Sequence, residues 1–214
     1  MNPPKILLTG GDGLLGTELK QYFKCDAPSI KELDITNEIK FEPYDLIIHC
    51  AAYTDVPKAE IERGKCFDTN VAGTFNMVNT FKDIPFVYIS TEYVYEPVNF
   101  YALTKLEAEK IVSEHRPTLI IRTLFKPRPF PFEKAFMDQY TNGDYVDVIA
   151  PMIATAILRW NWEINEVVNI GTGRKTIYEL AKQSRDVKPM SIEEIKDVKL
   201  PTGKNVPVVD SREL

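Results

Sequence analysis

A tyrosine and a lysine stand four residues apart in a segment with helical periodicity. Tyr101 and Lys105 would therefore lie one turn apart on the same side of a helix. A tyrosine that transfers protons near neutral pH must lose about 3 of its 10 pKa units, which costs roughly 4 kcal/mol. An ammonium about 4 Å away supplies roughly 4 kcal/mol at an effective dielectric constant near 20. The pair therefore suffices for acid-base chemistry, and Thr91, which ends the preceding apolar run, could hydrogen-bond a carbonyl beside it.

A glycine-rich turn near the N-terminus indicates a phosphate site. An apolar run after Lys5 leads into Gly10, Gly13 and Gly16 and then into a helical pattern, as a buried strand that turns onto a helix requires. Gly10 and Gly13 would let backbone amides approach a phosphate, and Gly16 would let the helix pack close to the strand. The helix dipole adds positive charge there. The spacing differs from the usual Gly-x-Gly-x-x-Gly, and an ordinary tight turn is the alternative.

Alternating strand and helix patterns must position these residues. The order predicts an α/β fold, namely a Rossmann-type doubly wound parallel sheet with right-handed crossovers. Ala51 and Ala52 end one apolar run, where small residues leave room for a ligand in the crevice of such a sheet. The expected elements are strands after Lys5 and at 45–52, 85–91 and 118–123, and helices after the glycines, around 66–81 and over 101–115.

The character of the chain changes after Leu124. The proline-dense stretch 126–131 cannot continue a central strand or helix. We predict an NAD(P)-binding Rossmann domain over 1–125 and a reduced substrate-binding region over 126–214, with segments of about 145–172 returning to the Rossmann core. The elements expected beyond the transition are helices at 132–140, 148–160 and 176–184, a strand at 167–170, and an extended surface loop at 199–207.

Composition limits the class of protein. The 214 residues, 44% of them hydrophobic, suffice for one large domain with a small appendage. A net charge of −5 argues against nucleic-acid binding, which needs clustered basic residues. No run approaches the roughly 18 apolar residues of a membrane span, and no signal segment opens the chain. We therefore expect a soluble, cytoplasmic protein without membrane contact.

Cysteine and histidine usage predicts no metal site. Cys25, Cys50 and Cys66 are odd in number and lack the spacing of metal ligands. Cys50 lies in an apolar strand pattern, which favours a small core residue over a nucleophile. His49 and His115 have no neighbours that would complete a catalytic or metal cluster, so both are interpreted as structural.

The segment after the first helix bears on the choice between NAD and NADP. In dinucleotide-binding folds an acidic residue about 20 residues past the glycines binds the ribose hydroxyls. Asp26 comes too early, while Ser29 lies nearer that point and Lys31 follows it. A missing acid beside a cation slightly favours NADP, and NAD(P) binding is the general expectation.

Taken together, these motifs resemble the extended short-chain dehydrogenase/reductase family, and most closely its dTDP-4-dehydrorhamnose reductase-like branch, in compact form. The resemblance covers about the first 125 residues, in order. The matching pieces are Thr9-Gly10-Gly11-Asp12-Gly13-Leu14-Leu15-Gly16, Leu33-Asp34-Ile35-Thr36, Ala51-Ala52-Tyr53-Thr54 with Lys58-Ala59-Glu60, Asn70-Val71-Ala72-Gly73-Thr74, Ser90-Thr91-Glu92-Tyr93-Val94-Tyr95 and Tyr101-Ala102-Leu103-Thr104-Lys105.

The resemblance implies a role for each matching position. Tyr101 would protonate a sugar C4 oxygen as hydride arrives from the nicotinamide, Lys105 would tune it, and Thr91 would orient the carbonyl. The implied cofactor-binding residues are Gly10, Gly13, Leu14, Leu15, Gly16, Asp34, Ile35, Ala51, Ala52, Tyr53, Asn70, Tyr101 and Lys105. The candidate substrate-binding residues are Thr91, Glu92, Tyr93, Lys126 and Arg128; the two cations would meet a diphosphate or are solvated loop cations.

The chain departs from the family pattern at three places. Only nine residues separate Thr91 from Tyr101, where the family carries a longer loop. Glu92 stands where the family has aspartate, and the region after Leu124 is far shorter than a full substrate domain. These departures affect the choice of substrate most.

Several functions stay open on this basis. The first is an NAD(P)-dependent nucleotide-sugar oxidoreductase that reduces a 4-keto-6-deoxy sugar nucleotide, or a relative that performs epimerisation or dehydration with the same tyrosine. The second is a non-catalytic NAD(P)-binding regulatory subunit, which the trimmed substrate region would suit. A homodimer is a further expectation, with Trp160 and Trp162 as candidate contacts, although burial is the commoner fate of tryptophan.

Overall fold

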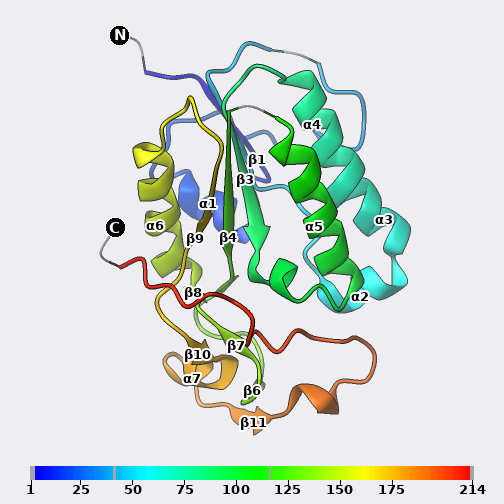
Figure 1. The fold of residues 1–214 in the computed structure, drawn as a ribbon, viewed down its shortest axis with the longest axis vertical. Helices are drawn as coiled ribbons and strands as arrows, with labels where there is room; N and C mark the ends of the chain where they lie inside the picture. Colours follow the sequence, from blue (N-terminus) through cyan, green and yellow to red (C-terminus); the bar gives the residue numbers. More distant parts are fainter. Residues whose placement is uncertain (1–2, 41, 116, 213–214) are drawn as a thin grey trace.

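A five-stranded parallel sheet forms the centre of the computed structural model, which describes residues 3–40, 42–115 and 117–212 (Figure 1). Neighbouring strands are parallel throughout the order β1-β2-β3-β4-β9. All residues of β1, β2 and β3 are buried, as expected when helices cover both faces. The predicted Rossmann-type doubly wound sheet is confirmed. The strands are β1 (Ile6–Thr9), β2 (Leu46–His49), β3 (Phe86–Thr91), β4 (Thr118–Thr123) and β9 (Glu166–Asn169).

A single bridge lies where a further strand would flank the outer side of β1. Leu8 N donates to Asp26 O, and Asp26 N donates to Ile6 O, both at 2.8 Å. The chain then returns across β1 to form β2, so the strand order reverses between β1 and β2. Ligands of such sheets bind outside the carboxyl ends of the strands at this reversal. Here Gly10 follows β1 and Ala51 follows β2, and a Cβ on Gly10 would lie 2.7 Å from Ala51 N.

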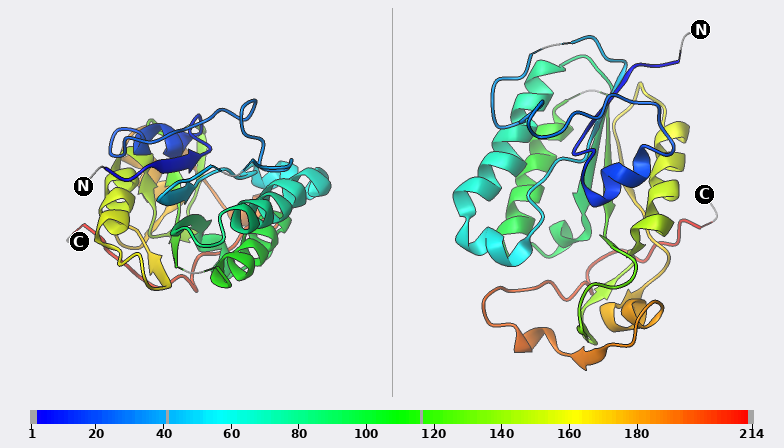
Figure 2. Two further views of the ribbon diagram at one scale, coloured as in Figure 1. Left: turned by 90° about the horizontal axis from the view of Figure 1, so that it is seen from above. Right: turned by 180° about the vertical axis from the view of Figure 1, so that it is seen from behind.

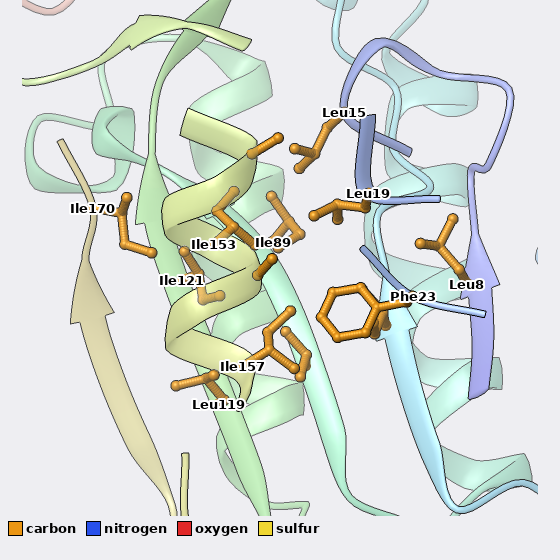
Figure 3. Packing of buried hydrophobic residues seen from close by; sticks show 14 of the residues in the cluster. Leu8, Leu15, Leu19, Phe23, Ile89, Leu119, Ile121, Ile153, Ile157 and Ile170 are labelled. Atoms are coloured by element: carbon orange, nitrogen blue, oxygen red, sulfur yellow. The ribbon is translucent and has the colours of Figure 1, made fainter. Parts of the chain in front are cut away.

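Two helices, α1 (Leu14–Leu19) and α6 (Val146–Arg159), cover one face of the sheet (Figure 2). Leu15 and Leu19 of α1, with Phe23 beyond it, point toward Ile153 and Ile157 of α6 (Figure 3). These apolar side chains recur at helical spacing, which gives each helix one buried stripe. The helices predicted after the glycines and over 148–160 are therefore confirmed.

Helices α4 and α5 cover the opposite face (Figure 1). Met77 of α4 and Ala108 and Val112 of α5 pack in one cluster with Phe86 and Tyr88 of β3. The helices on this side are α2 (Val56–Ile61), α3 (Arg63–Phe67), the π-helical η1 (Asp68–Gly73), α4 (Thr74–Thr80), the 3-10 turn η2 (Glu92–Tyr95) and α5 (Phe100–Ser113).

The remaining short elements form a layer below the carboxyl ends of the strands (Figure 1). They have a core of their own, which contains Phe130, Tyr145 and Leu180. Helix α6 and strand β9 instead belong to the main sheet and its cover, while the domain boundary at 125 stays a prediction. The pairs in this layer are β5 (Phe125–Lys126) with β8 (Asp144–Tyr145), β6 (Lys134–Phe136) with β11 (Lys188–Met190), and β7 (Tyr140–Thr141) with β10 (Lys175–Thr176), next to α7 (Ile177–Lys182) and the 3-10 turn η3 (Ile192–Glu194).

One expectation for this half of the chain is wrong, and a second holds only in part. The helix predicted at 132–140 is replaced by β6 and β7, because pairing with β11 and β10 decides the conformation of these short segments. The tail 199–207 forms the expected loop without helix or strand, and Lys204 and Asn205 are exposed. Part of it is packed, since Pro201 and Val206 are buried and Gln139 Nε2 donates to Pro201 O at 3.1 Å.

The tryptophans predicted as dimer contacts belong to the main core. Trp160 is 5% exposed, and its Nε1–H donates to Ile164 O at 3.0 Å. Trp162 is half-buried against the same cluster. Trp160 therefore offers no surface for a second copy.

Within the described ranges, no helix is long and apolar enough to cross a membrane, and no group of three or more His, Cys, Asp or Glu side chains could hold a metal ion. The three cysteines are free thiols. Cys50 is half-buried at the edge of the main core, and burial raises the pKa of its thiol to about 12, which disfavours a role as a nucleophile.

Candidate active site

A cleft of about 680 Å³ opens at the carboxyl ends of the strands, where the chain reversal between β1 and β2 predicts it. Its walls come from the glycine turn, the loop that contains Asp34, the ends of β2 and β3, the start of α5 and the segment after β4. Among its lining residues are most of the predicted site residues: Gly10, Gly13, Leu14, Leu15, Gly16, Asp34, Ile35, Ala51, Ala52, Thr91, Tyr93, Tyr101, Lys105 and Lys126.

The glycine turn is packed so tightly that side chains are excluded. Gly10 has a φ of +70°, and a Cβ on Gly16 would lie 2.3 Å from Gly10 O. Gly13 N donates to Gly10 O at 2.9 Å, which closes the turn. Gly13 also precedes α1 without a capping side chain, so no side chain of Gly13 occupies the backbone amides of Leu14 and Leu15, two residues that line the cleft. Such amides can bind an anion.

The wall around Asp34 is held rigidly against η1 and α4. Thr36 donates to Asp34 Oδ1 from its backbone N at 2.9 Å and from Oγ1 at 2.8 Å. Asn76 Nδ2 donates to Ile35 O at 3.0 Å. A Cβ on Gly73 would lie 2.8 Å from Ile35 Cδ1, so the small residue in the helix makes room for the loop. This wall is preformed.

Thr91 and Tyr101 meet where β3 ends and α5 begins. Asn99 caps α5, because its side chain accepts a hydrogen bond from Ala102 N at 2.9 Å, and this cap fixes the start of the helix next to Tyr101. The Tyr93 ring packs edge-on against the Tyr101 ring, with centroids 6.2 Å apart. Burial raises the pKa of the Tyr101 phenol, and a side-chain hydrogen bond with Thr91 opposes that rise.

Lys105 lies one turn further along α5 and is only 2% exposed. Its Nζ donates to Ile89 O at 2.8 Å and lies 4.0 Å from the centroid of the Tyr88 ring. Burial lowers the pKa of Lys105 to about 7, although the Glu109 carboxylate acts in the opposite direction. The lower phenol pKa predicted from the Tyr-Lys spacing is therefore wrong for this cleft, because desolvation penalises both charged forms.

The geometry of the cleft and sheet is that of a known family. A sequence model of the RmlD substrate binding domain matches residues 4–202. The chain belongs to this RmlD family. The expected resemblance to extended short-chain dehydrogenases/reductases of the dTDP-4-dehydrorhamnose reductase-like branch is thereby confirmed.

The named relatives of this RmlD-family chain include dTDP-4-dehydrorhamnose reductases and also 4,6-dehydratases of UDP-N-acetylglucosamine and of dTDP-D-glucose. A dTDP-4-dehydrorhamnose reductase of Mycolicibacterium smegmatis is 30% identical over 175 residues, which cover 69% of this chain and 50% of the relative. A solved dTDP-4-dehydrorhamnose reductase of Clostridium acetobutylicum has a TM-score of 0.81 at 25% identity, with 92% of this chain and 88% of that chain covered. Another, from Bacillus anthracis in complex with NADP, has a TM-score of 0.75 at 26% identity, with 89% and 85% covered. The chain thus spans half the length of the first curated relative.

Two predicted cofactor-binding residues of this RmlD-family chain do not line the cleft. Asn70 Oδ1 accepts from Tyr53 N at 2.8 Å, and its Nδ2 donates to Thr104 Oγ1 at 3.0 Å. Asn70 thus joins the loop after β2 to α5. The Tyr53 hydroxyl donates to Glu62 Oε2 at 3.1 Å.

Two predicted substrate-binding residues are likewise engaged elsewhere. The buried Glu92 carboxylate accepts from Thr141 Oγ1 at 2.6 Å and from Asn142 N at 3.0 Å. Arg128 donates from Nε to Asp147 at 2.9 Å, and its guanidinium lies 4.1 Å from the centroid of the Tyr145 ring. The direct roles of these side chains toward a ligand stay predictions.

The RmlD-family cleft also contains residues that the sequence did not single out. Pro28 and Ile30 line it near Asp34, and Phe125 and Phe132 line it after β4. Their only sequence signal was position, since they flank the Ser29 segment and the proline-dense stretch. Which of these side chains turn toward the cleft depends on the tertiary fold.

Proposed function

We propose that this chain is an NADP(H)-dependent reductase of a 4-keto-6-deoxy sugar nucleotide, of the dTDP-4-dehydrorhamnose reductase type. The observation that carries the proposal is the convergence of Thr91, Tyr101 and Lys105 on the same cleft that the glycine turn lines. The names of the relatives and the NADP complex of the Bacillus anthracis neighbour support both substrate class and cofactor.

The residues present fit a dinucleotide. The amides of Leu14 and Leu15, next to a turn in which a Cβ has no room, would hold its pyrophosphate. Asp34 and Ile35 would flank the adenine, and Ala51 and Ala52 leave room for the nicotinamide side. A bound dinucleotide supplies the hydride.

The electrostatics of the cleft favour the reductive direction. Because burial raises the pKa of Tyr101, the phenol is protonated at neutral pH and can donate its proton to a developing alkoxide, which is a far stronger base. Thr91 lies beside the phenol and orients the carbonyl oxygen. Lys105 gains its charge fully when polyanionic ligands enter, since a nearby anion favours the ammonium.

Of the two cations after β4, we assign the substrate diphosphate to Lys126. Lys126 lines the cleft, and burial lowers its pKa. An anion would restore the charged form. Arg128 is exposed and paired with Asp147. Lys126→Gln is therefore expected to raise the KM for the sugar nucleotide about tenfold, and Arg128→Gln serves as the matched control. Equal effects of the two substitutions would contradict the assignment.

The decisive experiment combines turnover with binding. The purified protein is mixed with NADPH and a dTDP-4-keto-6-deoxy sugar, and NADPH oxidation is followed. Tyr101→Phe should lower kcat at least 100-fold while NADPH still binds, because only the proton donor is lost. Turnover that survives this substitution would remove the mechanism. Isomerised or dehydrated product without net NADPH consumption would favour an epimerase or dehydratase, and binding without turnover would favour a regulatory subunit.

The choice of cofactor has a local test. Ser29 donates to Glu32 Oε2 from its backbone N and from Oγ, both at 2.8 Å. Lys31, the sequence neighbour of Glu32, is exposed. A 2′-phosphate would bind Lys31, so Lys31→Ala should weaken NADPH binding and leave NADH binding unchanged.

A homodimer and a cytoplasmic location stay predictions; light scattering tests the first and cell fractionation the second.

A further inference from the structure

The Lys105 ammonium lies on an aromatic surface inside the protein. Nζ is 4.0 Å from the centroid of the Tyr88 ring, and Tyr88 is 1% exposed. The attraction of a cation to a ring face is strongest where water is excluded. Besides this ring, Nζ contacts Ile89 O at 2.8 Å.

The neighbouring carboxylate on the same helix is engaged by other partners. Glu109, one turn beyond Lys105, accepts from Arg122 Nη2 at 2.6 Å and from Ser90 Oγ at 2.5 Å. It favours the Lys105 charge from a distance but forms no ion pair with it among the described residues. The ring and one carbonyl are therefore the groups that hold the ammonium.

The Tyr88 ring itself packs against a histidine ring. It stacks on His49, with centroids 5.9 Å apart and an interplanar angle of 27°. The His49 ring is held by hydrogen bonds with Thr9 Oγ1 at 2.7 Å and Thr74 Oγ1 at 3.2 Å. The Tyr88 ring thus contacts both the His49 ring and the Lys105 ammonium, and the hydrogen bonds of His49 limit the movement of this pair of rings.

The Tyr88 hydroxyl takes no part in this arrangement. Within the part of the chain that the structure describes, it makes no hydrogen bond of adequate geometry, although it is buried. Thr74, which lies near it, donates its own proton to Asn70 O at 2.7 Å. The ring is therefore the part of Tyr88 that contacts the ammonium, and a substitution that removes only the hydroxyl tests the two parts separately.

We propose that Tyr88 is a positioning residue for Lys105, whose ring face stabilises the ammonium and holds it in the wall that the lysine shares with Tyr101. The proposal rests on the proposed function for the chemistry that Lys105 serves. It goes beyond that function by adding a residue that has no contact with the cleft itself.

Three substitutions separate the ring from the hydroxyl and from general packing. Tyr88→Leu removes the ring face, and Tyr88→Phe removes only the hydroxyl. Phe86→Leu is the matched control, because Phe86 is equally buried on the same strand and also contacts His49, with centroids 5.7 Å apart. Thermal unfolding shows which variants are folded under the assay conditions.

The primary measurement is NADPH binding as a function of pH, which requires no turnover. Charged Lys105 favours the polyanion, and loss of the ring lowers the pKa of Lys105 further. Tyr88→Leu should therefore bind NADPH about tenfold more weakly at neutral pH. Its midpoint, the pH at which the NADPH affinity is halfway through its change, should lie at lower pH than that of native protein. Tyr88→Phe and Phe86→Leu should keep the native midpoint.

Four titratable groups near Lys105 keep their charge state near neutral pH. Burial holds the pKa of His49 near 3 and raises that of Cys50 to about 12. Burial also raises the pKa values of Cys66 and Tyr101 above their usual range. Lys126 and the phosphates of NADPH are the same for every variant, so a difference between variants near neutral pH reports on Lys105.

Each outcome decides the proposal. Tyr88→Leu that matches Phe86→Leu in affinity and midpoint would overturn it, as would Tyr88→Phe that behaves like Tyr88→Leu. If every protein binds NADPH without turning over the sugar nucleotide, the proposed function fails while the binding comparison still tests Tyr88. Where turnover is present, kcat/KM should follow the same order.

Discussion

At the scale of single residues, backbone contacts in the glycine turn limit the site more than any side chain does. Gly10 O is the atom that a Cβ on Gly16 would meet, and it also accepts from Gly13 N. Gly10 O and Gly13 N are backbone atoms, so they cannot make room for a Cβ on Gly16 unless the turn opens. The turn is therefore the most sensitive place at which to test the dinucleotide site.

Gly16→Ala should weaken NADPH binding at least tenfold, because its Cβ would lie 2.3 Å from Gly10 O and displace the turn. Isothermal titration measures the effect. Gly64→Ala in α3 is the control, since a Cβ there has nothing within 4 Å, and it should stabilise the protein by about 0.5–1 kcal/mol. Normal binding by Gly16→Ala would exclude this turn as the pyrophosphate site.

His49 makes stability depend on pH. Burial lowers its pKa from the usual 6.5 to about 3, so below pH 6.5 the unfolded chain takes up a proton that the folded chain refuses. The stability that neutral His49 provides is thus complete above pH 6.5 and declines toward pH 3, by about 1.4 kcal/mol per unit. Denaturant unfolding should show that the free energy of unfolding is lower near pH 5.5 than at pH 7, and that His49→Gln reduces this difference by about 1 kcal/mol. An equal difference in native protein and in His49→Gln would show that His49 is not the source of this pH dependence.

At the scale of elements, helix α5 carries the proposed chemistry and is held to two strands by one carboxylate. Tyr101 and Lys105 occupy its first turns, and Glu109 follows on the same side. Glu109 is 5% exposed and binds Arg122 of β4 and Ser90 of β3. The helix therefore cannot shift along the sheet without leaving a buried charge unpaired.

Glu109→Gln should destabilise the protein by about 3 kcal/mol, because it leaves the Arg122 guanidinium without its buried partner. Glu107→Gln, on the exposed side of the same helix, loses only a surface pair with Lys110 at 2.8 Å and should cost about 0.5 kcal/mol or less. Urea unfolding measures both. Similar values for the two variants would show that the buried pair does not anchor α5.

At the scale of the whole molecule, a buried carboxylate joins the Rossmann body to the lower layer. Glu92 directly follows Thr91 and accepts from the Thr141 hydroxyl and from Asn142 N. The Asn142 side chain in turn donates to Pro207 O at 2.8 Å and accepts from Val209 N at 3.2 Å. One chain of hydrogen bonds thus runs from the end of β3 to the C-terminal segment.

Glu92→Ala should cost about 2–3 kcal/mol, because it leaves the buried Thr141 hydroxyl and Asn142 N–H unpaired. Hydrogen exchange should accelerate in residues 140–143 and 206–211 while β1 and β2 stay protected. Glu193→Ala, at an exposed position of the lower layer, is the control. Unchanged exchange in the C-terminal segment would show that this connection is not structural.

Much of the first half of the chain could be predicted from local signals. Continuous apolar runs give β1, β2 and β3 because parallel strands are buried on both faces, and periodic apolar residues over 101–115 give α5. The lower layer could not be predicted in this way. Its strands are two or three residues long, so partners from distant parts of the chain decide their conformation, as at 134–136.

The sequence by itself determined which groups exist and in what order: a glycine turn, small residues after a buried strand, and Thr91, Tyr101 and Lys105 at fixed spacing. The tertiary structure alone decided their surroundings. It buried Lys105 on the Tyr88 ring, paired Glu92 and Arg128 with partners of their own, and reversed the expected direction of the Tyr101 pKa. The physical reason is that spacing along a helix fixes which side chains are neighbours, whereas desolvation depends on every segment that packs around them.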